Sequence, residues 1–137
     1  MRLLMMAACV GLTMSAATAQ EMSYGKAEYL NSCAVCRGVG GRGDGPLGDF
    51  LLKHPPDLTH LSERNGGRFP YSRVFATIDG RYAIPSYGDR EMPVWGRQFL
   101  EEDAKTYGPS GGEVVTTERI HNLTVTSRPC STRFGQQ

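Results

Sequence analysis

The chain has 137 residues, of which 15 are lysine or arginine and 14 are aspartate or glutamate, so its formal net charge is +1 with neutral histidines. This length suits one domain with a single hydrophobic core. The balanced charge argues against nucleic-acid binding, which depends on clustered Lys and Arg side chains that neutralise phosphates.

The first 19 residues have the layout of a secretory signal peptide. Arg2 precedes a mostly apolar run, and Ala17-Thr18-Ala19 forms a small-x-small cleavage site. We therefore expect residues 1–19 to be removed on export to the periplasm, with an uncleaved anchor as the alternative. Cleavage leaves 118 residues with 14 basic and 14 acidic side chains, and no second hydrophobic segment follows. We expect no membrane span in the mature chain.

Within the mature chain, residues 20–126 are expected to form an all-α domain with long loops. Residues 21–33 read as a helix of about three turns. The apolar stripe of this helix is predicted to be Tyr24, Ala27, Leu30 and Ala34, with Tyr29 and Cys33 beside it. Residues 37–48 hold six glycines, which predicts a loop. Pro55-Pro56 then forces an extended turn.

Three further helices are expected beyond this turn. The first ends at Gly80 and places apolar residues at i, i+3, i+4 and i+7, namely Tyr71, Val74, Phe75 and Ile78. A loop follows over residues 81–96. The other two helices are predicted over residues 98–108 and 112–125, and no strand-type alternation is sustained.

The end of the chain, residues 127–137, lacks a helical period. Pro129 is expected to stop the last helix, because proline lacks the N–H that the helix needs and clashes with the preceding turn. Cys130 is unpaired, which is unusual in an exported protein. We therefore expect an atypical, poorly ordered tail after residue 126.

Cys33 and Cys36 stand three positions apart, close enough to lie on one face of a helix. This spacing suits two thioether links to a haem edge, a redox disulfide or half of a zinc site. Zinc would need a second pair of ligands, and a thioredoxin-like role needs a βαβ context. Neither is visible, and a structural disulfide is the plainest alternative.

Met92 lies in a predicted loop, directly before Pro93 and 56 residues after Cys36. A methionine in such a place is usually core filler or surface. It also fits a thioether ligand to haem iron, a ligand type that raises the reduction potential in cytochromes c.

Several motifs in this order resemble those of class I c-type cytochromes, the small exported bacterial monohaem kind. The resemblance covers residues 24–125 and rests on the helix ending in CAVC, the GRGDGP loop, PPDLT, the YSRVFATIDG helix and MPVWG. It implies an all-α, cytochrome c-like fold around haem c. The thioethers would come from Cys33 and Cys36, and Met92 would be the distal iron ligand.

The same resemblance implies that Pro55-Pro56 lines the proximal side of the haem and that Trp95 packs near its edge. The implied function is the transfer of single electrons between periplasmic redox proteins. We expect a monomer, and we do not expect an enzyme, because no acid–base pair or nucleophile–base set stands out.

Arg37 occupies the position of the proximal histidine of the family. A guanidinium group has no lone pair to offer, so Arg37 is not expected to bind iron. It would also place a cation in a buried pocket, which is costly unless the charge is paired. The candidate substitute ligands are His54, His60 and His121, although each is typical of a surface or loop histidine. We therefore expect an electron-transfer protein of cytochrome c type that is impaired at its proximal ligand.

The rival interpretation belongs to another class. It is a haem-free exported binding module, held by a disulfide between Cys33 and Cys36.

Overall fold

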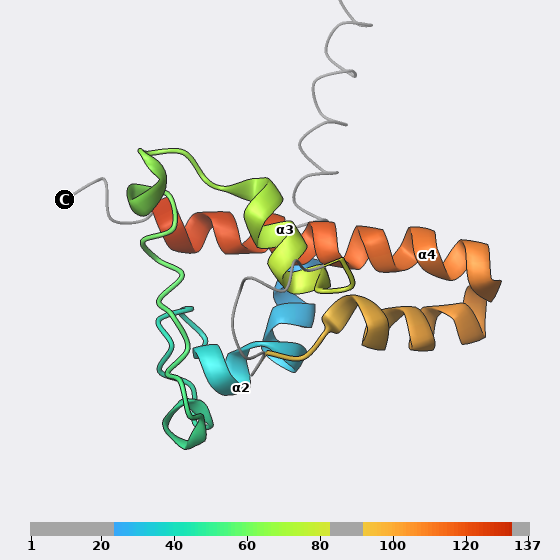
Figure 1. The fold of residues 1–137 in the computed structure, drawn as a ribbon, viewed down its shortest axis with the longest axis horizontal. Coiled ribbons are helices and arrows are strands. Elements are labelled where there is room, and N and C mark those ends of the chain that lie inside the picture. The colour runs from blue at the N-terminus through green and yellow to red at the C-terminus, as the bar shows by residue number, and fades with distance from the viewer. Residues whose placement is uncertain (1–23, 83–91, 133–137) are drawn as a thin grey trace, which may run out of the picture.

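The computed structural model describes residues 24–82 and 92–132, with side chains as far as Arg128. In these two ranges every regular element is a helix (Figure 1). The first helix occupies residues 24–32, and after it come α2 (Ala34–Arg37), η1 (Gly48–Phe50), η2 (Glu63–Asn65), α3 (Tyr71–Asp79) and α4 (Trp95–Thr132). The predicted all-α class is therefore confirmed for the described part of the chain. The expected signal peptide, residues 1–19, lies outside these ranges.

The α3 helix has the bounds and the buried side that its sequence predicts. Ile78 is buried, and Val74 and Phe75 are partly buried against the core. Gly80 ends the helix with φ 66°, and its N–H donates to the Ala76 carbonyl at 3.0 Å. Glycine adopts this left-handed conformation without the steric cost that other residues meet.

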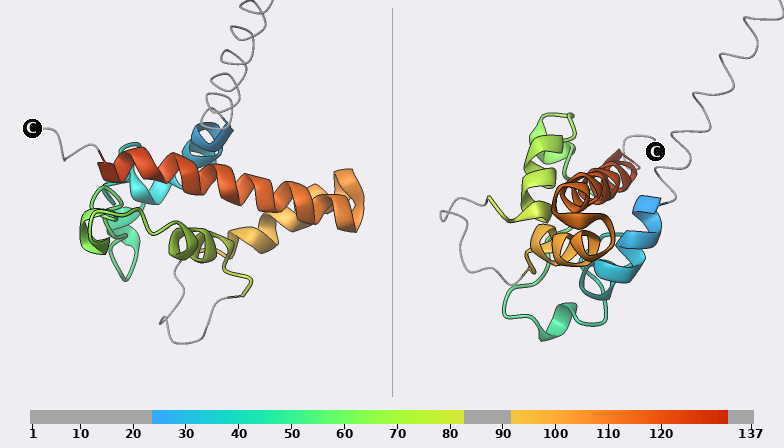
Figure 2. Two further views of the ribbon diagram at one scale, coloured as in Figure 1. Left: turned by 90° about the horizontal axis from the view of Figure 1, so that it is seen from above. Right: turned by 90° about the vertical axis from the view of Figure 1, so that its right-hand side faces the viewer.

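The long α4 helix is two helices joined at Gly108, which has φ 71° and ψ 173°. Figures 1 and 2 show the two arms running antiparallel, side by side. The arms can approach closely because Gly112 has no side chain. A Cβ at this position would lie only 2.7 Å from the Ala104 Cα. Thr116 then donates to the Asp103 carboxylate at 2.8 Å across the pair. The predicted end of a helix at residue 108 is confirmed.

The core combines residues from four helical segments. Tyr29 comes from the first helix, Ile78 from α3, Phe99 from the first arm of α4, and Ile120 and Leu123 from the second arm. Full burial of a side chain such as Ile120 or Leu123 contributes about 1.5–3 kcal/mol. This core fixes the first helix, α3 and both arms of α4 relative to one another.

The first helix buries a different face from the predicted one. Tyr24 and Leu30, which belong to the expected stripe, are 62% and 44% exposed. Gly25 and Tyr29 are buried instead, because the second arm of α4 crosses the helix at Gly25. A Cβ at Gly25 would lie 2.2 Å from the Asn122 carbonyl oxygen. The contact face is thus set by glycine's lack of a side chain, and the spacing of apolar residues along the helix does not reveal this.

The expected stop at Pro129 is wrong, because α4 continues to Thr132. The residues before the proline are polar but buried, since the Thr124 and Ser127 hydroxyls donate to the Ile120 and Leu123 carbonyls within the helix. Such bonds let a polar residue occupy a buried face. The boundary expected at residue 126 therefore falls inside a helix, while residues 133–137 lie outside the described ranges.

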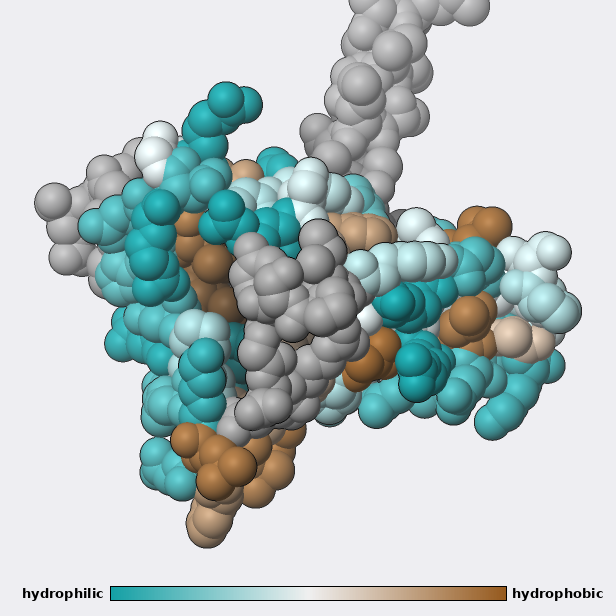
Figure 3. All heavy atoms as spheres, viewed as in Figure 1, coloured by the Kyte–Doolittle hydropathy of each residue, from teal (hydrophilic) through white to brown (hydrophobic). Residues whose placement is uncertain are grey.

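The loop around η1 carries exposed apolar side chains. Leu47, Phe50 and Leu52 are 46%, 82% and 101% exposed. The loop lies at the lower end of the molecule in Figure 1, where the surface in Figure 3 is brown. Within the described ranges, no helix combines the length and the apolar character that a bilayer crossing requires.

Candidate functional site

The two cysteines lie where the first helix gives way to α2. Cys33 is the N-cap of α2, and Gly38 ends this short helix with φ 74°. The glycine loop folds back onto α2, since a Cβ at Gly45 would lie 2.5 Å from the Cys36 carbonyl carbon. This close backbone approach agrees with the predicted loop. Both cysteines are half-buried and their thiols are free, so the structure gives no support to a Cys33–Cys36 disulfide.

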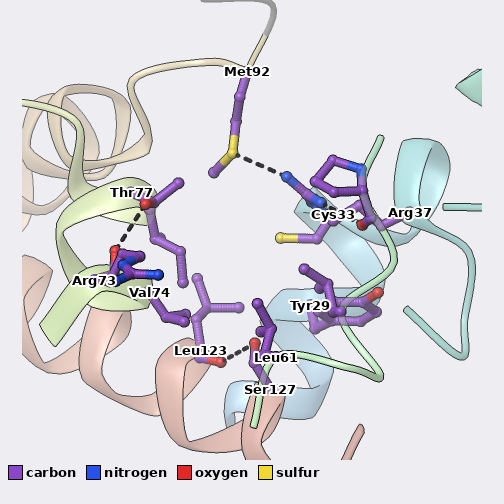
Figure 4. A pocket seen from close by; sticks show the side chains of 13 residues that line it. Tyr29, Cys33, Arg37, Leu61, Arg73, Val74, Thr77, Met92, Leu123 and Ser127 are labelled. Carbon is purple, nitrogen blue, oxygen red and sulfur yellow. Dashed lines mark hydrogen bonds between the residues drawn. The ribbon is translucent and has the colours of Figure 1, made fainter. Parts of the chain in front are cut away.

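An apolar cavity of about 220 Å³ opens beside Cys33 (Figure 4). Its apolar walls come from the first helix, the segment before η2, α3 and the second arm of α4, and they include Tyr29, Leu58, Leu61, Val74, Ile78 and Leu123. Figure 4 shows Met92 and Arg37 on one side of this space and Leu123 on the other. The fold therefore brings segments that are far apart in sequence around one space.

Arg37 and Met92 meet at this cavity. The Nη2 of Arg37 donates to the Sδ of Met92 at 3.5 Å, and its Nη1 donates to the Pro56 carbonyl at 3.2 Å. Met92 stands 55 positions after Arg37, so the fold joins the two predicted ligand positions directly. A thioether is a weak acceptor, and the guanidinium is only a donor.

The other residues that the resemblance assigns to the site are placed as follows. Cys33 and Pro56 line the cavity, whereas Cys36 does not. Pro55 is buried beside Gly43. Trp95 packs against the core and stacks on Phe99 with ring centroids 5.5 Å apart, outside the cavity lining.

The three histidines lie away from the cavity lining. His54 is exposed and contacts the Pro55 carbonyl. The Nδ1 of His60 lies 3.2 Å from the Asp57 carboxylate, and that of His121 lies 2.6 Å from the Tyr71 hydroxyl. In the described ranges no cluster of three or more His, Cys, Asp or Glu side chains could hold a metal ion.

Two features of the site do not follow from the motifs. Arg73 lines the cavity from α3, one position before the predicted core residue Val74. The Tyr29 hydroxyl donates to the Gly38 carbonyl at 2.8 Å and so ties the first helix to the glycine loop. Tyr29 stands four positions before Cys33, and this spacing could have placed its ring on the cysteine side of the helix.

Burial raises the pKa of the Cys33 thiol to about 11. Arg37 opposes this shift by favouring the thiolate, while Glu28 and Cys36 add to it. The shift is upward, so the thiol stays protonated at neutral pH and becomes a thiolate only as the pH approaches 11.

We expect native Cys33 to react with iodoacetamide about two orders of magnitude more slowly at pH 8 than an ordinary cysteine, because only the thiolate attacks. The rate should rise with pH beyond the range where an ordinary thiol has levelled off. Tandem mass spectrometry of the peptide that contains Cys33 and Cys36 separates the two sites, and the same chain in urea is the control. A native rate equal to the rate in urea would contradict the burial argument.

Comparison with protein-family models, with curated proteins and with solved structures finds no match to this chain.

Proposed function

We propose that the chain is an exported electron-transfer protein built on the plan of c-type cytochromes, with its haem site impaired at Arg37. One observation carries the proposal. Cys33 of the CxxC motif, Arg37 and Met92 lie around a single apolar cavity, although Met92 is more than fifty residues away in sequence. An apolar cavity with a cysteine thiol of a CxxC motif and a methionine thioether at its lining supports this proposal, because Met is one of the residues that bind haem iron in cytochromes c.

The side chains around the cavity fit haem c only in part. Cys33 offers a thiol for attachment, and Met92 offers a thioether of the type that binds haem iron. Arg37 has donors only, so it cannot supply the second iron ligand. The histidines do not line the cavity. The donor set therefore does not fit iron with ligands on both faces, and electron transfer by the natural chain should be impaired.

The cellular setting follows from the sequence. Residues 1–19 would direct export to the periplasm, where the partners would be redox proteins and the chain would act as a monomer. The near-balanced charge gives no support to a nucleic-acid partner.

The second candidate function is a haem-free exported binding module. It is favoured by the cation that Arg37 places at an apolar cavity, an arrangement suited to an anionic ligand. The structure does not support the Cys33–Cys36 disulfide expected for this module, because both thiols are free.

The test of the proposed function is covalent haem attachment in cells that carry the c-type maturation machinery. The natural chain is expected to hold little covalent haem, because Arg37 supplies no iron ligand. Any minor haem fraction should be high-spin, with Met92 as the remaining family ligand. Intact mass spectrometry and the absorbance spectrum measure both. A dominant species heavier by one haem would show that Arg37 does not impair loading.

A further inference from the structure

Arg37 lines the cavity, and the described residues provide no carboxylate partner for its charge. Its hydrogen bonds go to a peptide carbonyl and to the Met92 thioether, and no ion pair joins it. The thioether bond is long, at 3.5 Å, and sulfur is a weak acceptor. A carboxylate oxygen is a far stronger acceptor for a guanidinium.

The chain treats its other partly buried arginines differently. Arg81 is held by Asp79 at 2.6 Å and by Glu113 at 2.8 Å. Arg119 is held by Asp103 and Glu28 at 2.9 and 3.0 Å, and also by Glu102. Each of these cations therefore has carboxylates built in around it, as expected for partly desolvated charges. Arg37 departs from this pattern, although it lines a cavity.

The cavity has the size and the lining for a small apolar anion. Its volume of about 220 Å³ exceeds the roughly 150 Å³ of an apolar protein cavity that binds benzene. It is thus large enough for one aromatic ring or a short aliphatic chain with a carboxylate. Among the residues that the structure describes, two arginines, Arg37 and Arg73, line it, and no Asp or Glu does. The charge of the lining therefore favours a negative ligand.

We infer that the haem-free chain binds a small apolar monocarboxylate in this cavity. The ring or chain of the ligand packs against Leu58, Leu61 and Leu123, and its carboxylate takes the Nη2 donors of Arg37 in place of the Met92 thioether. Arg73 adds a second positive charge at the lining. A covalent haem attached at Cys33 would block this cavity, so the inference concerns the chain without haem and stands apart from the proposed electron-transfer function.

The test is titration calorimetry of the full haem-free protein with 3-phenylpropanoate and with the neutral 3-phenylpropanamide. The acid should bind at least tenfold more tightly than the amide, since a hydrogen bond to a charged group contributes about 1.5–3 kcal/mol. Arg37→Met should remove this preference. Arg97→Met is the matched control, because Arg97 is exposed and does not line the cavity, and it should leave the preference unchanged.

A second variant tests the cavity itself and keeps the inference open to refutation if Arg37→Met folds poorly. Val74→Phe retains both arginines and places a ring in the cavity, so it should reduce binding of the acid at least tenfold. The inference is overturned by equal binding of acid and amide, by equal weakening in Arg37→Met and Arg97→Met, or by no binding at millimolar acid. These outcomes leave the haem proposal untouched, because that proposal is tested by covalent mass.

Discussion

Arg37→His, made in cells with the c-type maturation machinery, is expected to yield a protein that carries covalent haem and is reducible and low-spin. This variant should change the protein more than any other single substitution. The natural chain should remain mostly without haem under the same conditions. Intact mass and the absorbance spectra of the oxidised and reduced protein measure the difference.

The physical reason lies in the donor set around the cavity. Imidazole offers a lone pair where guanidinium offers none, so His would provide a ligand to complement the Met92 thioether. Its second nitrogen could donate to the Pro56 carbonyl, which already accepts a hydrogen bond from Arg37 at 3.2 Å. The substitution also removes a permanent cation from an apolar cavity.

Two controls separate these effects. Arg37→Gln removes the cation without supplying imidazole, so it should stay largely free of haem. Met92→Ala in the Arg37→His background should leave haem attached but convert it to high-spin, because the thioether ligand is lost. A soluble, folded Arg37→His protein without haem would mean that the cytochrome interpretation is wrong. Haem loading of Arg37→Gln equal to that of Arg37→His would mean that the charge, and not the missing ligand, blocks the natural chain.

Gly25→Ala is expected to destabilise the fold by about 3 kcal/mol or more, because a buried overpacked site must shift its neighbours. The added Cβ would lie 2.2 Å from both the Asn122 carbonyl oxygen and the Thr126 hydroxyl oxygen. One of these is backbone, so the helix crossing itself would have to open. At an exposed helix position, Gly→Ala would stabilise the protein by roughly 1 kcal/mol. A decrease in the free energy of unfolding therefore identifies the close crossing at Gly25.

Ala27→Gly is the matched control, since Ala27 is exposed on the same helix. It should destabilise by about 1 kcal/mol through helix propensity alone. Denaturant unfolding followed by circular dichroism gives both free energies of unfolding. If helix propensity alone governed both sites, Gly25→Ala would raise the free energy of unfolding and Ala27→Gly would lower it. A Gly25→Ala protein as stable as the natural chain would refute the close crossing.

The sequence was sufficient to predict the elements that depend on neighbouring residues alone. The spacing of Tyr71, Val74 and Ile78 predicts α3, and Gly80 ends it as expected. Gly108 likewise separates two helices where the pattern breaks. These elements need only an apolar period and a residue that tolerates a left-handed backbone.

The sequence was insufficient to predict contacts that depend on which helix or loop packs against a residue. Gly25 sets the buried face of the first helix only because the Asn122 backbone lies against it. Ser127 is polar yet buried, because its hydroxyl bonds within its own helix. The cysteine spacing and the position of Met92 did indicate a shared site, but not the direct contact between Arg37 and Met92.

The salt bridge between Glu28 and Arg119 has a consequence for the order of folding, because its partners are separated by 91 positions. Closing so long a loop costs chain entropy before any contact repays it. During synthesis, the first helix cannot meet its crossing partner until the second arm of α4 exists. A nascent chain that ends before residue 119 would leave Tyr29 without Ile120 and Leu123 to cover it. The domain should therefore form late and as one cooperative unit, and not helix by helix from its beginning.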